Sequence, residues 1–98
     1  MESEVHVAGV LVQARPGRAG AVAAAVSGLP NAEVRAIGEA GKLVVVCEGA
    51  SGADVLALIG RIRDLPGVVD VALVYQHAES AAAMEEEIGD ETDPPRVH

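Results

Sequence analysis

The sequence predicts an α+β domain of the ferredoxin-like kind, in which two β-α-β units build a four-stranded antiparallel sheet. Two observations support this prediction. Four short strand-like runs alternate with two stretches of helical periodicity in the order β-α-β-β-α-β. A Leu-Pro pair follows each helical stretch, at Leu29-Pro30 and Leu65-Pro66. Because right-handed crossovers place both helices on one face of the sheet, we expect the strand order 4-1-3-2 and an uncovered second face.

The strands in the middle of this sheet are expected to be the first and the third. The third, 43–47, is a run of five apolar residues, of which three are β-branched. The first, 5–13, also has apolar residues at both odd and even positions. Strands that are apolar on both faces are typical of the centre of a sheet. The second strand, 33–37, alternates polar and apolar residues and is expected at an edge, and the fourth covers 68–76.

Both helices are predicted from an apolar stripe and from the residues that bound them. The first is expected over 17–27 and should end at Gly28. Its stripe consists of Val22, Val26 and Leu29. The second is expected to begin at Ser51, whose hydroxyl can cap the backbone N–H of Asp54, and to end at Pro66-Gly67. Its buried stripe consists of Val55, Leu58, Ile59, Ile62 and Leu65.

Length and charge indicate one small folded domain over 1–79, followed by an acidic tail over 80–98 that we expect to be flexible. Of the net charge of −8, residues 1–78 contribute −2, with eight acids and six bases, and residues 79–98 contribute −6, with seven acids and one base. Nucleic acid requires a basic surface, so this balance argues against it as a partner. A single cysteine, the lack of a signal segment and the lack of a bilayer-spanning apolar run predict a soluble cytoplasmic protein without membrane insertion.

The uncovered face of the sheet is the candidate functional surface. If Leu43, Val45 and Cys47 point to the helices, the alternate residues of that strand line the other face. Odd positions of the first strand and even positions of the fourth are expected to join them, because Val71, Leu73 and Tyr75 are the bulkier set. The residues expected on this face are Val7, Gly9, Leu11, Gln13, Lys42, Val44, Val46, Glu48, Asp70, Ala72, Val74 and Gln76. A contiguous apolar patch on a small domain is typical of a binding surface.

Other chemistries lack support in the sequence. The histidines His6, His77 and His98 have no ligand spacing with one another or with the cysteine, so we expect no metal site. Cys47 lies in the middle of a strand and is interpreted as a small buried hydrophobic residue. No serine has a base beside it, and no catalytic constellation is visible. We therefore expect a protein that is not an enzyme and holds no cofactor.

Three segments resemble the NapD family, in one register that spans about residues 6–79. They are 6–14, 42–48 and 65–77. NapD proteins are cytoplasmic chaperones of NapA, the catalytic subunit of the periplasmic nitrate reductase. The resemblance implies a ferredoxin-like protein that binds the twin-arginine signal peptide of the NapA precursor, as a helix, on the open sheet face. Such a protein delays export through the Tat translocase until the molybdenum cofactor and the iron–sulfur cluster are inserted.

The chain departs from the family pattern at three positions. Ala8 and Gly9 stand where the family usually has two serines, and Gln76 replaces the first of two histidines. A smaller and more apolar face still suits the hydrophobic part of a signal peptide. The two arginines of the peptide would be received by Glu48, by Asp70 or by the acids of the tail.

The rival interpretation is a small-molecule-sensing or assembly domain of the ACT or AsnC-effector kind, which would dimerise through its sheet. Such domains usually accompany a DNA-binding or enzyme domain, and this chain has room for neither. We expect a monomer or a weak homodimer, and mass in solution distinguishes this from the rival's tight dimer.

Overall fold

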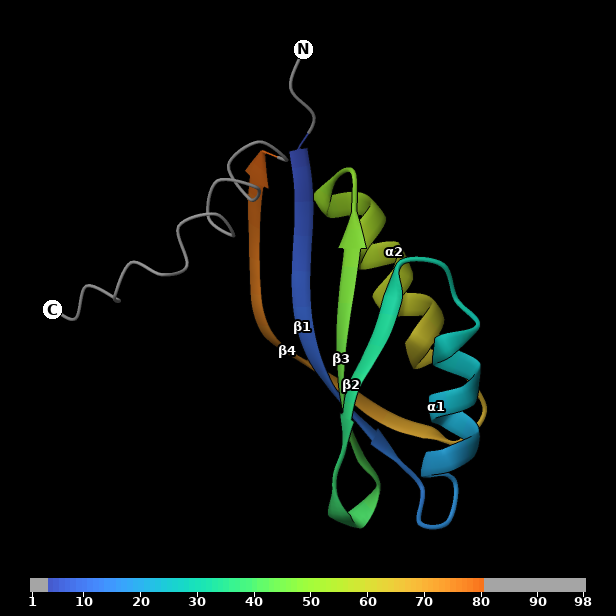
Figure 1. Ribbon diagram of the computed structural model, residues 1–98. Helices are drawn as coiled ribbons and strands as arrows, with labels where there is room; N and C mark the ends of the chain where they lie inside the picture. The colour runs from blue at the N-terminus through green and yellow to red at the C-terminus, as the bar shows by residue number, and fades with distance from the viewer. Residues whose placement is uncertain (1–3, 81–98) are drawn as a thin grey trace, which may run out of the picture.

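The computed structural model describes residues 4–80, which form a four-stranded sheet and two α-helices (Figure 1). In chain order the elements are β1 (Glu4–Ala14), α1 (Ala19–Ser27), β2 (Ala32–Ile37), the short 3-10 helix η1 (Glu39–Gly41), β3 (Lys42–Gly49), α2 (Gly52–Arg63) and β4 (Val68–Ser80). The strands are ordered β2-β3-β1-β4, and every neighbouring pair is antiparallel. The ferredoxin-like arrangement and the strand order are thus confirmed. The predicted tail, apart from its first residue, lies outside the described residues.

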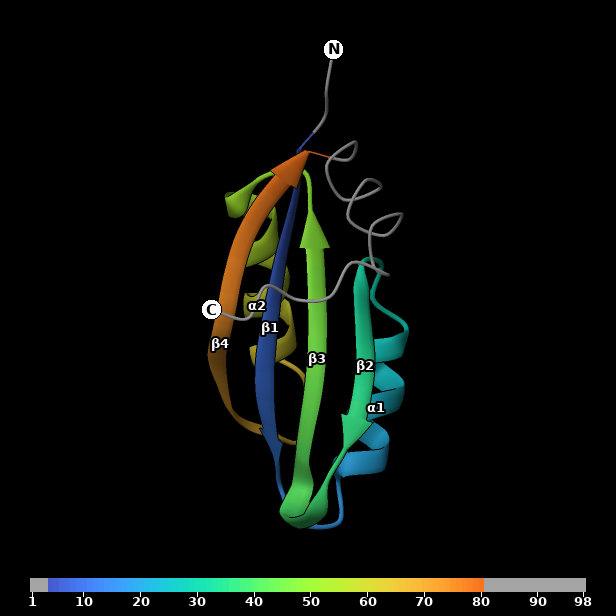
Figure 2. The same cartoon turned by 60° about the vertical axis from the view of Figure 1, so that its left-hand side comes forward.

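Both helices lie against the same face of the sheet, and Figure 2 looks onto the opposite face with the helices behind it. The core fills the layer between the helices and the sheet. The strands β1 and β3 lie at the centre of the sheet, as their apolar residues on both faces predict. The members of the core are Ala8, Val10, Val12 and Ala14 of β1, Leu43, Val45 and Cys47 of β3, Val22 and Val26 of α1, Val55, Leu58, Ile59 and Ile62 of α2, and Val71 of β4.

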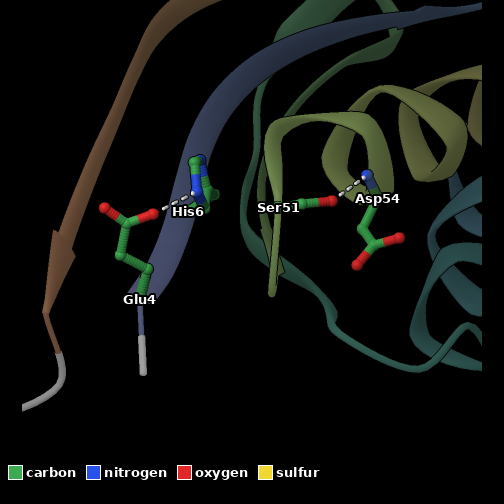
Figure 3. Close-up of polar contacts among 4 residues, drawn as sticks. All are labelled: Glu4, His6, Ser51 and Asp54. Carbon is green, nitrogen blue, oxygen red and sulfur yellow. Dashed lines mark hydrogen bonds and ion pairs between the residues drawn. The ribbon is translucent and has the colours of Figure 1, made fainter. Parts of the chain in front are cut away.

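The start of α2 follows the predicted capping chemistry. Ser51 has an extended backbone, and its Oγ accepts a hydrogen bond of 3.1 Å from the backbone N–H of Asp54 (Figure 3). This bond satisfies a donor that the first helical turn leaves without an intrahelical partner. Asp54 in the first turn and Arg61 and Arg63 in the last turn also complement the helix dipole.

The first helix starts later than predicted. It begins at Ala19 because Gly17 has a φ of 81°, and the backbone N–H of Arg18 bonds to the carbonyl three residues earlier at 2.9 Å. These residues form a turn that leads into the helix. No side chain caps the first turn of α1. The helix therefore depends on the packing of Val22 and Val26, which are both fully buried.

The last strand extends beyond its predicted end and contains a β-bulge. Its pairing with β1 shifts at two points, between Gly9 and Val10 and between Gln13 and Ala14. At the first, Gly9 lies opposite Tyr75 whereas Val10 lies opposite Leu73. Val74 is therefore an extra residue with no partner in β1. Directly opposite residues of an antiparallel pair share a face of the sheet, so the bulge reverses the alternation of β4 after this point.

Candidate functional site

The face of the sheet opposite the helices consists of cross-strand rows that the register defines. In these rows Val7 lies between Glu48 and His77, Gly9 between Val46 and Tyr75, Leu11 between Val44 and Ala72, and Gln13 between Lys42 and Asp70. We call these residues the open face. The alternate residues of β1, from Ala8 to Ala14, are at most 1% exposed and lie in the core. The first strand therefore has the outward parity that the sequence analysis expects.

The middle of the open face is aliphatic. Val44 is 42% exposed and Ala72 is exposed, whereas Leu11 and Val46 are half-buried. These side chains are short, so an apolar helix or peptide can approach the backbone of β1 and β3 closely. The arrangement offers an apolar contact surface and no reactive group.

An aromatic side chain that the sequence analysis assigned to the core lies on this face. The ring of Tyr75 covers Gly9, since a Cβ at Gly9 would lie 2.7 Å from its Cζ and 2.8 Å from its Cδ2. The ring also stacks on His77, with centroids 5.9 Å apart and planes 19° from parallel. The expected place of Tyr75 among the helix-facing residues is wrong because the bulge at Val74 reverses the alternation. A glycine inside a strand often marks such a close approach, so Gly9 was the available signal.

The same bulge moves Gln76 to the other side of the sheet. Gln76 lies directly opposite the core residue Ala8, and its Nε2 is 3.8 Å from the position of a Cβ at Gly52, next to the start of α2. The expectation that Gln76 lines the open face is therefore wrong. Val74, also expected there, is the extra residue of the bulge on an edge strand and is 67% exposed.

One end of the open face is bordered by a carboxylate beside a hollow. The hollow has a volume of about 180 Å³ and is lined by Asn31, Ala32, Glu33, Val46 and Glu48. Glu33 forms an ion pair with Arg35, with 3.3 Å between Oε1 and Nε. Within residues 4–80 no ion pair involves Glu48, which is exposed. This carboxylate can therefore receive a cationic partner.

The other end is formed by Lys42, Gln13 and Asp70, in one row. The side-chain amide of Gln13 donates hydrogen bonds to the carbonyls of Ala14 at 3.1 Å and Ala40 at 2.6 Å. Gln13 thereby fastens the β2–β3 hairpin to β1, a structural role that the sequence did not indicate. Lys42 and Asp70 are exposed, and neither joins an ion pair in the described part of the chain.

The other singled-out residues have structural positions. Cys47 is fully buried, as predicted, and burial raises the pKa of its thiol because desolvation disfavours the thiolate. The Nε2 of His6 lies 3.1 Å from Oε1 of Glu4 near the start of β1 (Figure 3). Residues 4–80 contain no group of three or more potential metal ligands, and none of their helices is long and apolar enough to span a membrane. His98 lies outside the described residues.

Comparison with known proteins identifies the family. A sequence model described as "NapD protein" matches residues 5–80. The chain belongs to the NapD family. The chaperone NapD of Paracoccus pantotrophus is 36% identical over 72 residues, which cover 74% of this chain and 63% of that relative, slightly less than two thirds of its length. The chaperone NapD of Haemophilus influenzae is 31% identical over 75 residues, which cover 76% of this chain and 81% of that relative.

The fold agrees with this assignment to NapD. The chain is similar to the solution structure of the Escherichia coli Tat proofreading chaperone NapD, with a TM-score of 0.69 and 28% identity, covering 100% of this chain and 95% of that one. The resemblance stated from sequence is thus confirmed. The relatives are named chaperones, in agreement with the prediction that the chain is not an enzyme.

Proposed function

We propose that this NapD protein binds a twin-arginine signal peptide on its open face, and that its client is the NapA precursor in the cytoplasm. Covering the leader delays export through the Tat pathway until the cofactors of the client are inserted. The observation that carries the proposal is the apolar middle of the open face, which neither α1 nor α2 covers. The family supports it, because a structurally characterised member is described as a Tat proofreading chaperone.

The chemistry of such a peptide matches the surface. Two arginines precede an apolar stretch, and the apolar stretch can pack on Leu11, Val44, Val46 and Ala72. Removing apolar area from water contributes about 25 cal/mol per Å². An exposed ion pair contributes only about 0–1 kcal/mol. Apolar contact therefore dominates the affinity, and the charges adjust orientation and association rate.

The chain carries its own optical probe of this surface. It contains one tyrosine and neither tryptophan nor phenylalanine, so its intrinsic fluorescence comes from Tyr75 alone. Tyr75 lies on the open face and is 45% exposed. Binding of a peptide without aromatic residues is therefore expected to change the tyrosine emission, in parallel with the heat measured by titration calorimetry.

The decisive experiment compares two apolar-to-acid substitutions. Val44→Asp places a carboxylate in the middle of the open face, and burying that charge under a peptide is expected to weaken binding at least about tenfold. Leu56→Asp is the matched control, since Leu56 lies on α2 and is 58% exposed. The control should bind like the wild type. A folded Val44→Asp variant with wild-type affinity would contradict the proposed surface.

The state of association tests the same proposal against its rival. A monomer or weak homodimer whose tyrosine emission responds to the peptide supports a chaperone. A tight dimer in sedimentation experiments that is indifferent to the peptide would instead support an assembly domain that pairs through its sheet.

A further inference from the structure

We propose, on the basis of the proposed function, that the signal peptide lies on the open face in one direction. Its arginines lie at the end formed by Glu48 and Tyr75, and its apolar stretch runs along the strands toward Lys42. The inference rests on three properties of the described residues, which are the length of the face, the aromatic ring beside the acidic end, and the sign of the charge at each end.

The length of the open face suits a short helix. Glu48 and Lys42 are the ends of one face of β3, and six residues of strand correspond to about 20 Å. A helix rises about 1.5 Å per residue, so roughly 13 residues cover this distance. If the arginines lie at one end of the open face, a helix of this length that follows them covers the aliphatic rows.

The Glu48 end combines two features that recognise a guanidinium group. The Glu48 carboxylate has no ion-pair partner within residues 4–80 and borders the hollow that Glu33 and Val46 also line. Tyr75, two strands away and roughly 10 Å across the sheet, lies in the next row and is 45% exposed. One side of its ring stacks on His77, the β4 residue of the Glu48 row, so the other side is the one open to an arginine. A carboxylate binds an arginine through charge-assisted hydrogen bonds, and an aromatic face binds one through a cation–π contact. Consecutive arginines could thus use both groups.

The Lys42 end favours the opposite pole of the peptide. Lys42 repels arginine side chains and offsets the charge of Asp70, which lies in the same row across Gln13. The amide of Gln13 is engaged with the carbonyls of Ala14 and Ala40. A bound helix carries partial positive charge at its N-terminus and partial negative charge at its C-terminus. With the arginines at Glu48, both helix ends meet a charge of opposite sign on β3. The reverse direction would place like charges together at both ends of β3 and would leave Asp70 of β4 as the acid beside the arginines.

The direction can be read with spin-labelled peptides. The chain holds a single, buried cysteine, so the label is placed on the peptide, either before its arginines or after its apolar stretch. In amide spectra of the wild-type protein, the label before the arginines should broaden the amide signals of Val46 and Glu48. The label after the apolar stretch should broaden those of Lys42 and Leu43. Reversed or equal broadening would overturn the direction. Absence of any binding would instead contradict the proposed function, so the two failures are distinguishable.

Charge variants give an independent test. Glu48→Gln is expected to weaken the binding of a peptide with two arginines about two- to fivefold. The affinity for a peptide with two glutamines in their place should be nearly unchanged. Lys42→Gln is the matched control at the other end and should not weaken the arginine peptide. Tyr75→Leu should weaken it about two- to fivefold, and Tyr75→Phe, which keeps the aromatic face, should retain most of the affinity. Equal losses for Glu48→Gln and Lys42→Gln would overturn the proposal.

Discussion

The two faces of the sheet use the same small apolar residues for different purposes. On the helix side, Val10, Val45 and their neighbours are fully buried against α1 and α2. On the open face, Val44 remains 42% exposed, and Leu11 and Val46 are only half-buried. The comparison teaches that residue type alone does not distinguish core from binding surface in a strand. The difference comes mainly from which parity the helices cover, and Val7, at 8% exposed, is the buried exception among the valines of the open face.

The largest expected effect is a difference in stability between substitutions on the two faces of the sheet. Ile62→Ala removes a fully buried side chain between α2 and the sheet and is expected to cost about 2–5 kcal/mol of unfolding free energy. Val44→Ala on the open face should cost less than about 1 kcal/mol, because its side chain is already partly hydrated. Urea unfolding followed by circular dichroism measures both. Similar losses for the two variants would show that the open face is packed against something in solution.

The next effect concerns the hairpin that joins β2 and β3 at the Lys42 end of the sheet. Gly41 has a φ of 78°, and a Cβ there would lie 2.5 Å from the carbonyl oxygen of Ala14. Gly41→Ala is therefore expected to destabilise the fold by about 1–3 kcal/mol. Ala40→Gly is the matched control, because Ala40 already has a φ of 61° and glycine adopts this conformation without strain. The control should keep or slightly raise the unfolding midpoint.

A smaller effect appears at alkaline pH on the helix side. Burial raises the pKa of the Cys47 thiol, whereas a thiol in the unfolded chain ionises near pH 8.5, at about the ordinary value. The unfolded state thus loses its proton first. The stability contribution is complete below the unfolded pKa and is lost as the pH rises through the folded pKa, by at most about 1.4 kcal/mol per pH unit.

Cys47→Ala isolates this contribution, because the variant and the wild type have every other titrating group in common. Urea midpoints between pH 7.5 and 10, roughly spanning the unfolded pKa, should fall more steeply for the wild type than for the variant. Parallel curves would mean that the thiol is accessible to water in the folded protein, contrary to its burial.

The smallest effect on stability is expected at Gly9 on the open face, where the ring of Tyr75 packs against β1. Gly9→Ala places a Cβ within 2.8 Å of Cζ and Cδ2 of Tyr75, so the ring must move off β1. The ring is partly exposed and can rotate outward, so the cost should stay below about 1 kcal/mol while the tyrosine emission changes. Gly60→Ala on α2 meets nothing within 4 Å and should raise stability without changing the emission. Unchanged emission in Gly9→Ala would contradict the close packing.

Local signals explain which parts of the fold could be predicted. The doubly apolar pattern of β1 and β3 placed both strands at the centre, and Ser51 with Asp54 marked the start of α2. The placement of Lys42, Val44, Val46 and Glu48 followed from the alternation of β3. These features depend on near neighbours in the chain, which the sequence displays directly.

The fourth strand could not be predicted in the same way. Its run of apolar residues fits either parity, and the bulge at Val74 depends on pairing with β1, far away in the chain. Tyr75 and Gln76 consequently exchanged faces relative to the prediction. The late start of α1 has a similar origin, because the turn around Gly17 replaces the expected first helical turn. The role of the open face in peptide binding stays a prediction.

The exit point of β4 has a kinetic consequence. Ser80 lies opposite Glu4, at the Glu48 end of the sheet. The following segment, 81–98, contains six acids and one base and is covalently attached beside the proposed arginine end. Tethering raises the effective concentration of negative charge there. If the open face binds the peptide as proposed, we expect this charge to speed encounter with a cationic leader at low ionic strength. A chain ending at Ser80 should associate more slowly in stopped-flow mixing yet dissociate at the same rate, and added salt should remove the difference.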